Sequence, residues 1–347
     1  MDWVLLLVSL VVILFGAKLF TNGVEWIGEG FGLSAGAVGS VLAAIGTALP
    51  ETVLPVIAIV GGGGAHSGEE IGIGAILGAP FMLATLAMTV MGLSLAWYAR
   101  SGRRVRSLAI DPGLTAMDLA FFLVMYGAAV LAGVIHVRPA HWALSAALLA
   151  GYGVYVWRHF RSEGEAEEER EAAGEIHPLS FTKWAARVRR SPRRADVAPP
   201  TWASVVQTLV ALAIIVGGAR VFVDGIHHVA TSLGVSPLLF SLVVAPIATE
   251  LPELFNSVLW VGRDKDVLAL GNVTGAMVFQ SSFPVTIGLL FTPWQLTGDA
   301  VLSAAIALFV GLVLLIVVRI RGTLTVPVLV APCVLYAAFV AVVIATG

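Results

Sequence analysis

Two glutamate residues, Glu51 and Glu253, occupy the same place in two copies of one motif. Each ends a Thr-x-Leu-Pro-Glu sequence inside a stretch of otherwise apolar residues, and the longer segments 16–51 and 218–253 align without a gap at a constant offset of 202 residues. Carboxylates are preferred oxygen ligands of hard cations, and two of them balance the charge of a divalent cation such as Ca²⁺. The duplication therefore predicts a cation site that takes one carboxylate from each copy.

A proline precedes each glutamate and predicts an interruption of the helix at that point. Pro50 and Pro252 lack a backbone N–H and clash with the preceding helical turn. Carbonyl groups freed by such a break are tolerated at membrane depth only where they line a cavity or bind something. Thr47 and Thr249, which open the two motifs, would add further oxygens. We expect these oxygens and the two glutamates to form a site made entirely of oxygen atoms.

Glu250 offers a third carboxylate on the second copy. It stands three residues before Glu253 and would share a helix face with it if the helix were intact. Three carboxylates near one site can hardly all stay ionised without a cation, so we expect at least one of them to bind a proton. The alternative is that Glu250 faces an aqueous vestibule and only adjusts the electric field.

The composition indicates the elements that must position these residues. The chain has 347 residues, of which 58% are hydrophobic and 12% charged, and its mean hydropathy is +0.94. Apolar runs of about 20 residues, enough to span about 30 Å of hydrocarbon, recur along it. We therefore predict an all-α polytopic membrane protein with ten transmembrane helices, at roughly 3–21, 34–60, 71–97, 114–135, 140–157, 203–223, 236–260, 267–291, 299–318 and 324–346.

One long polar segment, residues 158–200, separates two sets of five spans, 1–157 and 201–347. Cationic residues concentrate in this linker and in the loops predicted on its side of the membrane. The positive-inside rule then predicts a cytoplasmic linker, both termini outside, and a multi-pass protein of the cell inner (plasma) membrane. Because each set has an odd number of spans, the two copies would enter the membrane in opposite directions, as inverted repeats do.

Aromatic residues and histidines near the predicted span ends suggest surface positions. Tryptophans favour the membrane–water interface, so we expect the following residues to form interfacial belts: Trp3, Trp97, Trp142, Trp157, Trp202, Trp260 and Trp294. Histidines lie in or near the loops predicted outside, where we expect them to be solvated; these are His66, His136, His141, His227 and His228.

At the two motifs the chain resembles the cation/Ca²⁺ antiporter superfamily, which includes the sodium/calcium exchangers. The residues that carry the resemblance are Gly46-Thr-Ala-Leu-Pro-Glu51 with Gly74-Ala-Ile-Leu-Gly-Ala-Pro80, and Ala248-Thr-Glu-Leu-Pro-Glu253 with Gly271-Asn-Val-Thr-Gly-Ala-Met277. The resemblance implies ten spans in two inverted halves. It also implies that Glu51 and Glu253 are the central ion ligands, with Thr47 and Thr249 beside them.

Several positions depart from the pattern of that family. Ala79 and Ala276 stand where the family has a serine, and Leu83 and Gln280 stand where it has an Asn or Asp ligand. By this resemblance Gln280 becomes a candidate ligand. The departures remove neutral oxygens that Na⁺ would use, whereas a proton needs only a carboxylate.

We therefore expect a secondary antiporter, not an enzyme, that exchanges a divalent cation for another ion. Ca²⁺ is the expected cation, and the resemblance places Na⁺ slightly ahead of H⁺ as counter-ion. The candidate ligands are Glu51, Glu253, Thr47, Thr249, Glu250 and Gln280. Partners are expected to be cations and the lipid bilayer, with no cofactor, nucleotide or nucleic acid. The alternatives are a cation-binding membrane protein that does not transport, or an intramembrane enzyme using the paired carboxylates, which no second catalytic motif supports.

Overall fold

The computed structural model describes residues 2–30, 49–61, 65–102, 104–135, 138–159, 179–180, 199–296 and 298–346. These residues are almost wholly helical, as the sequence predicts. The first part of the chain contains α1 (Asp2–Gly30), α4 (Leu49–Gly61), α5 (Ala65–Met82), the π-helix η2 (Leu83–Ala87), α6 (Met88–Arg100), β1 (Ser107–Leu108), α7 (Pro112–Ile135) and α8 (Arg138–His159).

The second part contains α11 (Thr201–Leu233), α12 (Pro237–Thr249), α13 (Leu251–Val261), α14 (Asp266–Gln280), α15 (Phe283–Phe291), α16 (Gly298–Arg321), β2 (Leu324–Thr325), α17 (Val326–Val330) and α18 (Pro332–Thr346). In the described part of the chain, seven helices are long and apolar enough to cross a membrane. An eighth crossing results if α12 and α13 form one span broken by a 48° bend. The ten spans expected from the sequence remain a prediction.

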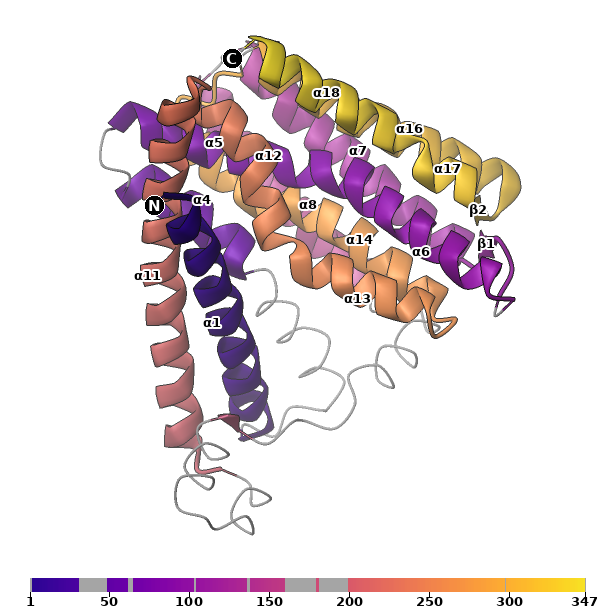
Figure 1. Ribbon diagram of the computed structural model, residues 1–347, viewed down its shortest axis with the longest axis horizontal. Helices are drawn as coiled ribbons and strands as arrows, with labels where there is room; N and C mark the ends of the chain where they lie inside the picture. Colours follow the sequence, from indigo (N-terminus) through magenta and orange to yellow (C-terminus); the bar gives the residue numbers. More distant parts are fainter. Residues whose placement is uncertain are drawn as a thin grey trace.

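α1 and α11 lie side by side along one edge of the molecule (Figure 1). Their contacts are reciprocal. A Cβ atom at Gly16 would meet Ile215, and one at Gly218 would meet Ile13. The offset of 202 residues relates Gly16 to Gly218 and Ile13 to Ile215. The two copies therefore use the same residues against each other, and the two helices run antiparallel.

The buried apolar side chains form two clusters. The smaller one lies among α1, α4, α5, α11 and α12, and the larger one extends from α5 to α8 and from α12 to α18. Ala248, just before the second acidic motif, belongs to the smaller cluster, and Leu254, just after it, belongs to the larger one. Glu250 and Glu253 therefore lie between a residue of one cluster and a residue of the other.

Both copies interrupt the regular α-helix at equivalent positions in the span after the acidic motif. In the first copy, the five-residue π-helix η2 separates α5 from α6. In the second copy, Ser281 and Ser282 form a turn between α14 and α15. The second pair of motifs aligns at an offset of 197 residues, which sets Leu83 opposite Gln280. π-turns within α-helices occur frequently at functional sites.

A two-residue antiparallel ladder is an exception to the predicted all-α fold. Ser107 pairs with Thr325 and Leu108 with Leu324. The ladder joins the loop after α6 to the segment after α16, so that backbone hydrogen bonds connect the two halves of the chain.

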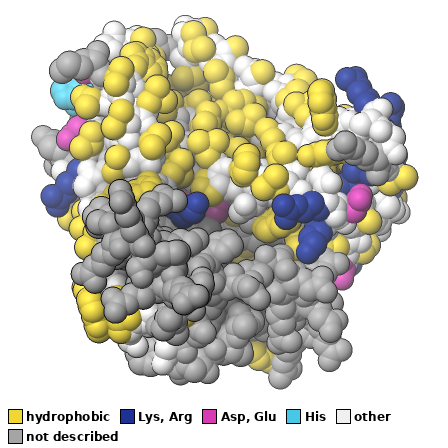
Figure 2. All heavy atoms as spheres, turned by 60° about the horizontal axis from the view of Figure 1, so that its bottom comes forward, with side chains coloured by type: hydrophobic (Ala, Val, Ile, Leu, Met, Phe, Trp, Pro, Cys, Tyr) yellow, Lys and Arg dark blue, Asp and Glu magenta, His cyan; other side chains and the backbone are white. Residues whose placement is uncertain are grey.

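Hydrophobic side chains cover much of the described part of the face shown in Figure 2, and Lys and Arg lie there in a few separate groups. Five of the predicted belt tryptophans are more than half exposed: Trp3, Trp97, Trp142, Trp157 and Trp202. The prediction for Trp294 is wrong. Its side chain is fully buried, because the segment after α15 folds back on α7, where Trp294 Nε1 donates a hydrogen bond to the Ala129 carbonyl at 3.0 Å.

Candidate cation site

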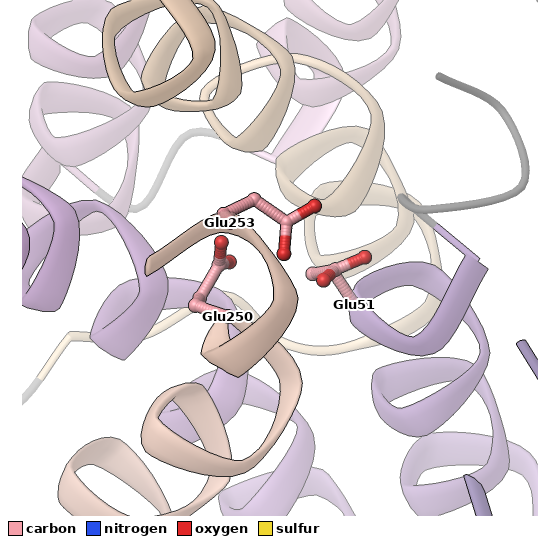
Figure 3. A group of neighbouring side chains, drawn as sticks. All are labelled: Glu51, Glu250 and Glu253. Carbon is pink, nitrogen blue, oxygen red and sulfur yellow. The ribbon is translucent and has the colours of Figure 1, made fainter. Parts of the chain in front are cut away.

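The structure brings Glu51, Glu250 and Glu253 together. Each offers one carboxylate oxygen, and these three oxygens lie within 4.8 Å of one another. The three side chains point toward one another, Glu51 from α4 and the other two from the junction of α12 and α13 (Figure 3). They are 5%, 1% and 7% exposed, respectively. The alternative position of Glu250, facing an aqueous vestibule, is therefore wrong.

The junction between α12 and α13 has a local cause. Pro252 occupies the first turn of α13, where its missing N–H and fixed φ are favourable. The same missing N–H leaves the Ala248 carbonyl without its donor four residues on. The helix bends by 48° at this point, which confirms the interruption predicted at Pro252. The residues before α4 lie outside the described ranges, so the interruption at Pro50 remains a prediction.

Helix ends meet at this junction, an N-terminus that favours negative charge and a C-terminus that favours positive charge. Glu253 lies in the first turn of α13, where the partial positive charge of a helix N-terminus favours an anionic side chain. α12 ends at Thr249, which is 5% exposed. The carbonyl groups at a helix C-terminus favour a positive charge. Broken helices inside membranes use their ends in this way around bound ions.

Four carboxylate oxygens of the cluster lack a hydrogen-bond partner. Among the described residues, nothing donates to either oxygen of Glu51, to Oε2 of Glu250 or to Oε2 of Glu253. Buried charges are normally paired or coordinate a metal, because burying an unpaired one is costly. Acidic residues within membrane spans are correspondingly rare and functional. The four oxygens therefore suit a cation that replaces the missing donors.

Gln280 reaches the cluster from the end of α14. Its Nε2 donates to Oε1 of Glu250 at 2.9 Å, and the side chain is 2% exposed. The sequence predicted Gln280 as a ligand of the cation, but in the structure its amide N–H donates to a glutamate carboxylate. Leu83, the equivalent residue of the first copy, is fully buried in the apolar core. Thr47, the remaining candidate, lies outside the described residues.

The sequence prediction did not assign Asn272 to the site. Its Nδ2 donates to the Glu253 carbonyl at 3.1 Å and to Ser257 Oγ at 3.2 Å. Ser257 in turn donates to the Ala269 carbonyl at 3.1 Å. These bonds attach α14 to α13 beside the glutamate. The available signal was the asparagine of the second Gly-Asn motif, which has Ala75 as its counterpart in the first copy.

Small residues let α5 approach α12 closely. A Cβ atom at Gly74 would lie 2.4 Å from the Leu238 carbonyl oxygen, and one at Gly78 would lie 2.1 Å from that of Leu242. The Gly-x-x-x-Gly spacing therefore allows the two helices to pack closely. α12 leads directly into the glutamate junction, so this packing fixes the position of the site.

Comparison with known proteins identifies the class. The sequence pattern of the family described as sodium/calcium exchanger protein matches residues 1–161 and 203–345. The chain belongs to this family, and so to the cation/Ca²⁺ antiporter superfamily that its motifs resemble.

Individual relatives are distant. The uncharacterized membrane protein MJ0091 of Methanocaldococcus jannaschii is 24% identical over 82% of the chain and 80% of its own length. The inner membrane protein YrbG of Escherichia coli is 22% identical over 84% of the chain and 80% of its own length. The putative antiporter CaxA of Alkalimonas amylolytica is 31% identical, but the match spans only 31% of the chain and 34% of that protein.

Two solved structures share the fold. The H⁺/Ca²⁺ exchanger CAX superposes with a TM-score of 0.70 and 16% identity, covering 99% of this chain and 85% of CAX. The sodium–calcium exchanger NCX_Mj superposes with a TM-score of 0.54 and 20% identity, covering 98% of this chain and 97% of that protein. At these identities the likeness establishes a common fold, and the ions must be argued from the site itself.

Proposed function

We propose that this protein is a secondary antiporter that exchanges Ca²⁺, or a similar divalent cation, for protons by alternating access. The observation that carries the proposal is the cluster of Glu51, Glu250 and Glu253, buried and within 4.8 Å of one another. Ca²⁺ takes about six to eight oxygen ligands in flexible geometry. Carboxylate oxygens, Thr249 and carbonyl groups freed at the broken helix supply ligands of this kind.

The counter-ion follows from what the site contains. Three carboxylates this close cannot all remain ionised once the cation leaves, so protons replace it. Na⁺ would need neutral oxygens, and Ala79, Ala276 and Leu83 offer none from their side chains. The site therefore supports proton exchange better than the sodium exchange that the family resemblance suggested. Members of the family are exchangers, and we propose that these glutamates bind ions and catalyse no reaction.

The proposed architecture is ten spans in two inverted halves, with both termini outside and linker 158–200 in the cytoplasm. The reciprocal, antiparallel contacts of α1 and α11 support it, because helices related by an in-plane two-fold axis meet in this way. We propose that this pair moves against the remaining helices, which hold the glutamates. The two halves would then expose the site to each side in turn.

Flux measurements in proteoliposomes test the proposal. Purified protein is reconstituted, and Ca²⁺ movement is followed under an imposed pH gradient without Na⁺, and then under a Na⁺ gradient at fixed pH. Proton exchange predicts Ca²⁺ movement under the pH gradient alone. Movement only under the Na⁺ gradient would establish sodium exchange. No response to either gradient, with Ca²⁺ still bound, would indicate a cation-binding protein that does not transport.

A further inference from the structure

α8 presents a buried face to its neighbours. Residues three, four or seven apart lie on one side of a helix, and four residues of α8 at these spacings are no more than 5% exposed: His141, Ser145, Leu148 and Tyr155. α7 and α15 pack against this helix. The sequence predicted His141 to be solvated near a loop, and that prediction is wrong, because it belongs to this buried face.

Two residues of this face have polar atoms without partners. Among the described residues, no hydrogen bond reaches either imidazole nitrogen of His141 or the hydroxyl of Ser145. The two residues are only 2% and 3% exposed, and they stand one helical turn apart. Buried polar groups without a protein partner are normally hydrogen-bonded to ordered water. This part of α8 is therefore built to hold water inside the protein.

The neighbouring helix α15 contributes a matching group. Thr286 Oγ1 is also buried and has no hydrogen-bond partner in the described chain. The ring of Tyr152 in α8 contacts that of Phe283 at 5.5 Å. From that contact, Ser145 lies about 10 Å along α8 and Thr286 about 5 Å along α15.

α8 runs antiparallel to the span formed by α14 and α15. A Cβ atom at Gly275 of α14 would lie 3.5 Å from Tyr155 Oη, whereas Tyr152, earlier in α8, contacts Phe283, later in that span. Thr286 and Ser145 therefore lie on the same side of the contact between Tyr152 and Phe283. Along the helix axes they are about 5 Å apart, or about one helical turn.

Polar residues continue from Thr286 toward the glutamates. Ser281 and Ser282 form the fully buried turn that precedes α15. Gln280, the next residue back, donates to Glu250. Buried polar side chains thus stand at the beginning of α8, in α15 and in the turn next to Gln280, although the Ser281 and Ser282 hydroxyls donate to backbone carbonyls.

We propose that His141, Ser145 and Thr286, linked by bound water, form a proton path between the beginning of α8 and the three glutamates. His141 accepts a proton from bound water on one ring nitrogen and releases the proton of the other nitrogen to the next bound water. The two hydroxyl groups orient that water and pass the proton on. Histidine suits this step because its ordinary titration lies near neutral pH. The inference rests on the proposed exchange for protons.

The elements packed against His141 carry few ionisable side chains in the described part of the chain. Among the described residues of α15, of segment 292–296 and of α7 from residue 120 onward, the only ionisable side chain is Tyr126, whose hydroxyl donates to the Leu77 carbonyl. On α8 itself, Arg138 stands three residues before His141, and Tyr152, Tyr155, Arg158 and His159 lie toward the opposite end.

Two measurements distinguish a proton path from a structural role of His141: Ca²⁺ uptake driven by a pH gradient, and exchange of Ca²⁺ for Ca²⁺. The His141→Gln variant keeps a polar side chain but cannot relay a proton. We expect its Ca²⁺ uptake driven by a pH gradient to fall about tenfold or more, the size of effect that proton-transferring groups have. Exchange of external Ca²⁺ for internal Ca²⁺ needs no proton movement, so it should stay at the wild-type rate. His228→Gln, a change at an exposed histidine of α11, is the matched control.

Each outcome decides the inference. Loss of both transport modes in His141→Gln would show a structural role, and unchanged proton-driven uptake would show that no proton passes His141. Either result would overturn the path while leaving the antiporter intact. The Ser145→Val variant should reproduce the selective loss to a smaller degree. Absence of proton-driven uptake in the wild type would instead overturn the proposed counter-ion, and the path with it.

Discussion

The three glutamates of the site differ in how their oxygens are held. Both carboxylate oxygens of Glu51 lack a partner among the described residues, whereas Gln280 holds one oxygen of Glu250. Glu253 is fixed through its backbone, because Asn272 binds its carbonyl group. Glu51 and one oxygen of each of the other two glutamates are therefore available to a cation.

Replacing Glu250 should change the pH dependence of transport. The Glu250→Ser variant removes one of three neighbouring carboxylates, so each remaining carboxylate loses the repulsion of one neighbour and the empty site needs fewer protons. We expect Ca²⁺ uptake to depend less steeply on pH than in the wild type, measured in proteoliposomes over a pH series without Na⁺. An unchanged pH profile would show that Glu250 takes no part in proton binding.

Removing the Asn272 amide should weaken the site without touching a carboxylate. Asn272→Leu breaks the bonds to the Glu253 carbonyl and to Ser257, at a cost of about 1–3 kcal/mol for the partners left buried. We expect a lower melting temperature together with weaker Ca²⁺ binding. The control is Asn256→Leu, at a partly exposed position of α13. Equal effects of the two variants would contradict the role of Asn272.

The main acidic residues of the site could be predicted from the sequence because duplication marks them. Glu51 and Glu253 recur at one offset in equivalent motifs, and Glu250 lies one turn from the second. Duplication gave no such signal for Asn272, because its counterpart in the first copy is Ala75. Gln280 acts as a donor because its amide N–H, and not its amide oxygen, faces the carboxylate of Glu250. Sequence spacing does not indicate which of the two groups faces it.

At the scale of the elements, the site depends on interrupted helices held by close packing. α12 and α13 meet at the glutamates, and α5 fixes α12 through two glycines. A helix end can present carbonyl groups to an ion only if neighbouring helices keep it in place. Packing between α5 and α12 is therefore part of the ion site even though no residue of α5 is a candidate ligand.

A methyl group at Gly78 should disturb this packing. The Cβ of Gly78→Ala would lie 2.1 Å from the Leu242 carbonyl oxygen and 2.6 Å from Pro246 Cγ. We expect a loss of about 1–3 kcal/mol from overpacking, seen as a lower melting temperature and reduced transport. At Gly153 of α8 nothing lies within 4 Å of an added Cβ, so Gly153→Ala should leave both unchanged. Equal stability of the two variants would argue against the close contact.

The helices could largely be predicted from the sequence, but their irregularities could not. Apolar runs and Pro252 predict spans and a break because they act locally. The π-helix at Leu83–Ala87 shifts the backbone register within an apolar run, and no residue type signals it. His141 and Trp294 resemble interfacial residues because each lies near the end of a span. Only tertiary packing buries them.

At the scale of the whole molecule, two equivalent helices, α1 and α11, run antiparallel and pack against each other. Gly16 and Gly218 make the same contact from opposite sides. This arrangement supports an inverted repeat, in which each half presents the site to a different side of the membrane. The sequence predicts the same relation from an odd number of spans in each half.

Cysteine labelling tests the inverted arrangement. In a chain whose native Cys333 is replaced by Ser, single cysteines are introduced at Ser101, Ser162 and Gly64. The positive-inside rule predicts labelling of the first two from the cytoplasmic side only, and of the third from outside only. Membrane-impermeant reagents on intact cells and on inverted vesicles give the answer. Labelling of Ser101 and Gly64 from the same side would contradict the inverted repeat.

The central claim is that Glu51 and Glu253 together bind a divalent cation, and equilibrium binding of radiolabelled Ca²⁺ to the purified protein tests it most directly. The wild type should bind Ca²⁺ saturably. Glu51→Gln and Glu253→Gln, which keep the side-chain shape but remove one charge each, should each weaken binding at least about tenfold, or about 1.4 kcal/mol. Asp264→Asn, a change at an exposed carboxylate in the turn before α14, should bind as the wild type does. Wild-type affinity in either glutamine variant, with the protein folded, would contradict the claim.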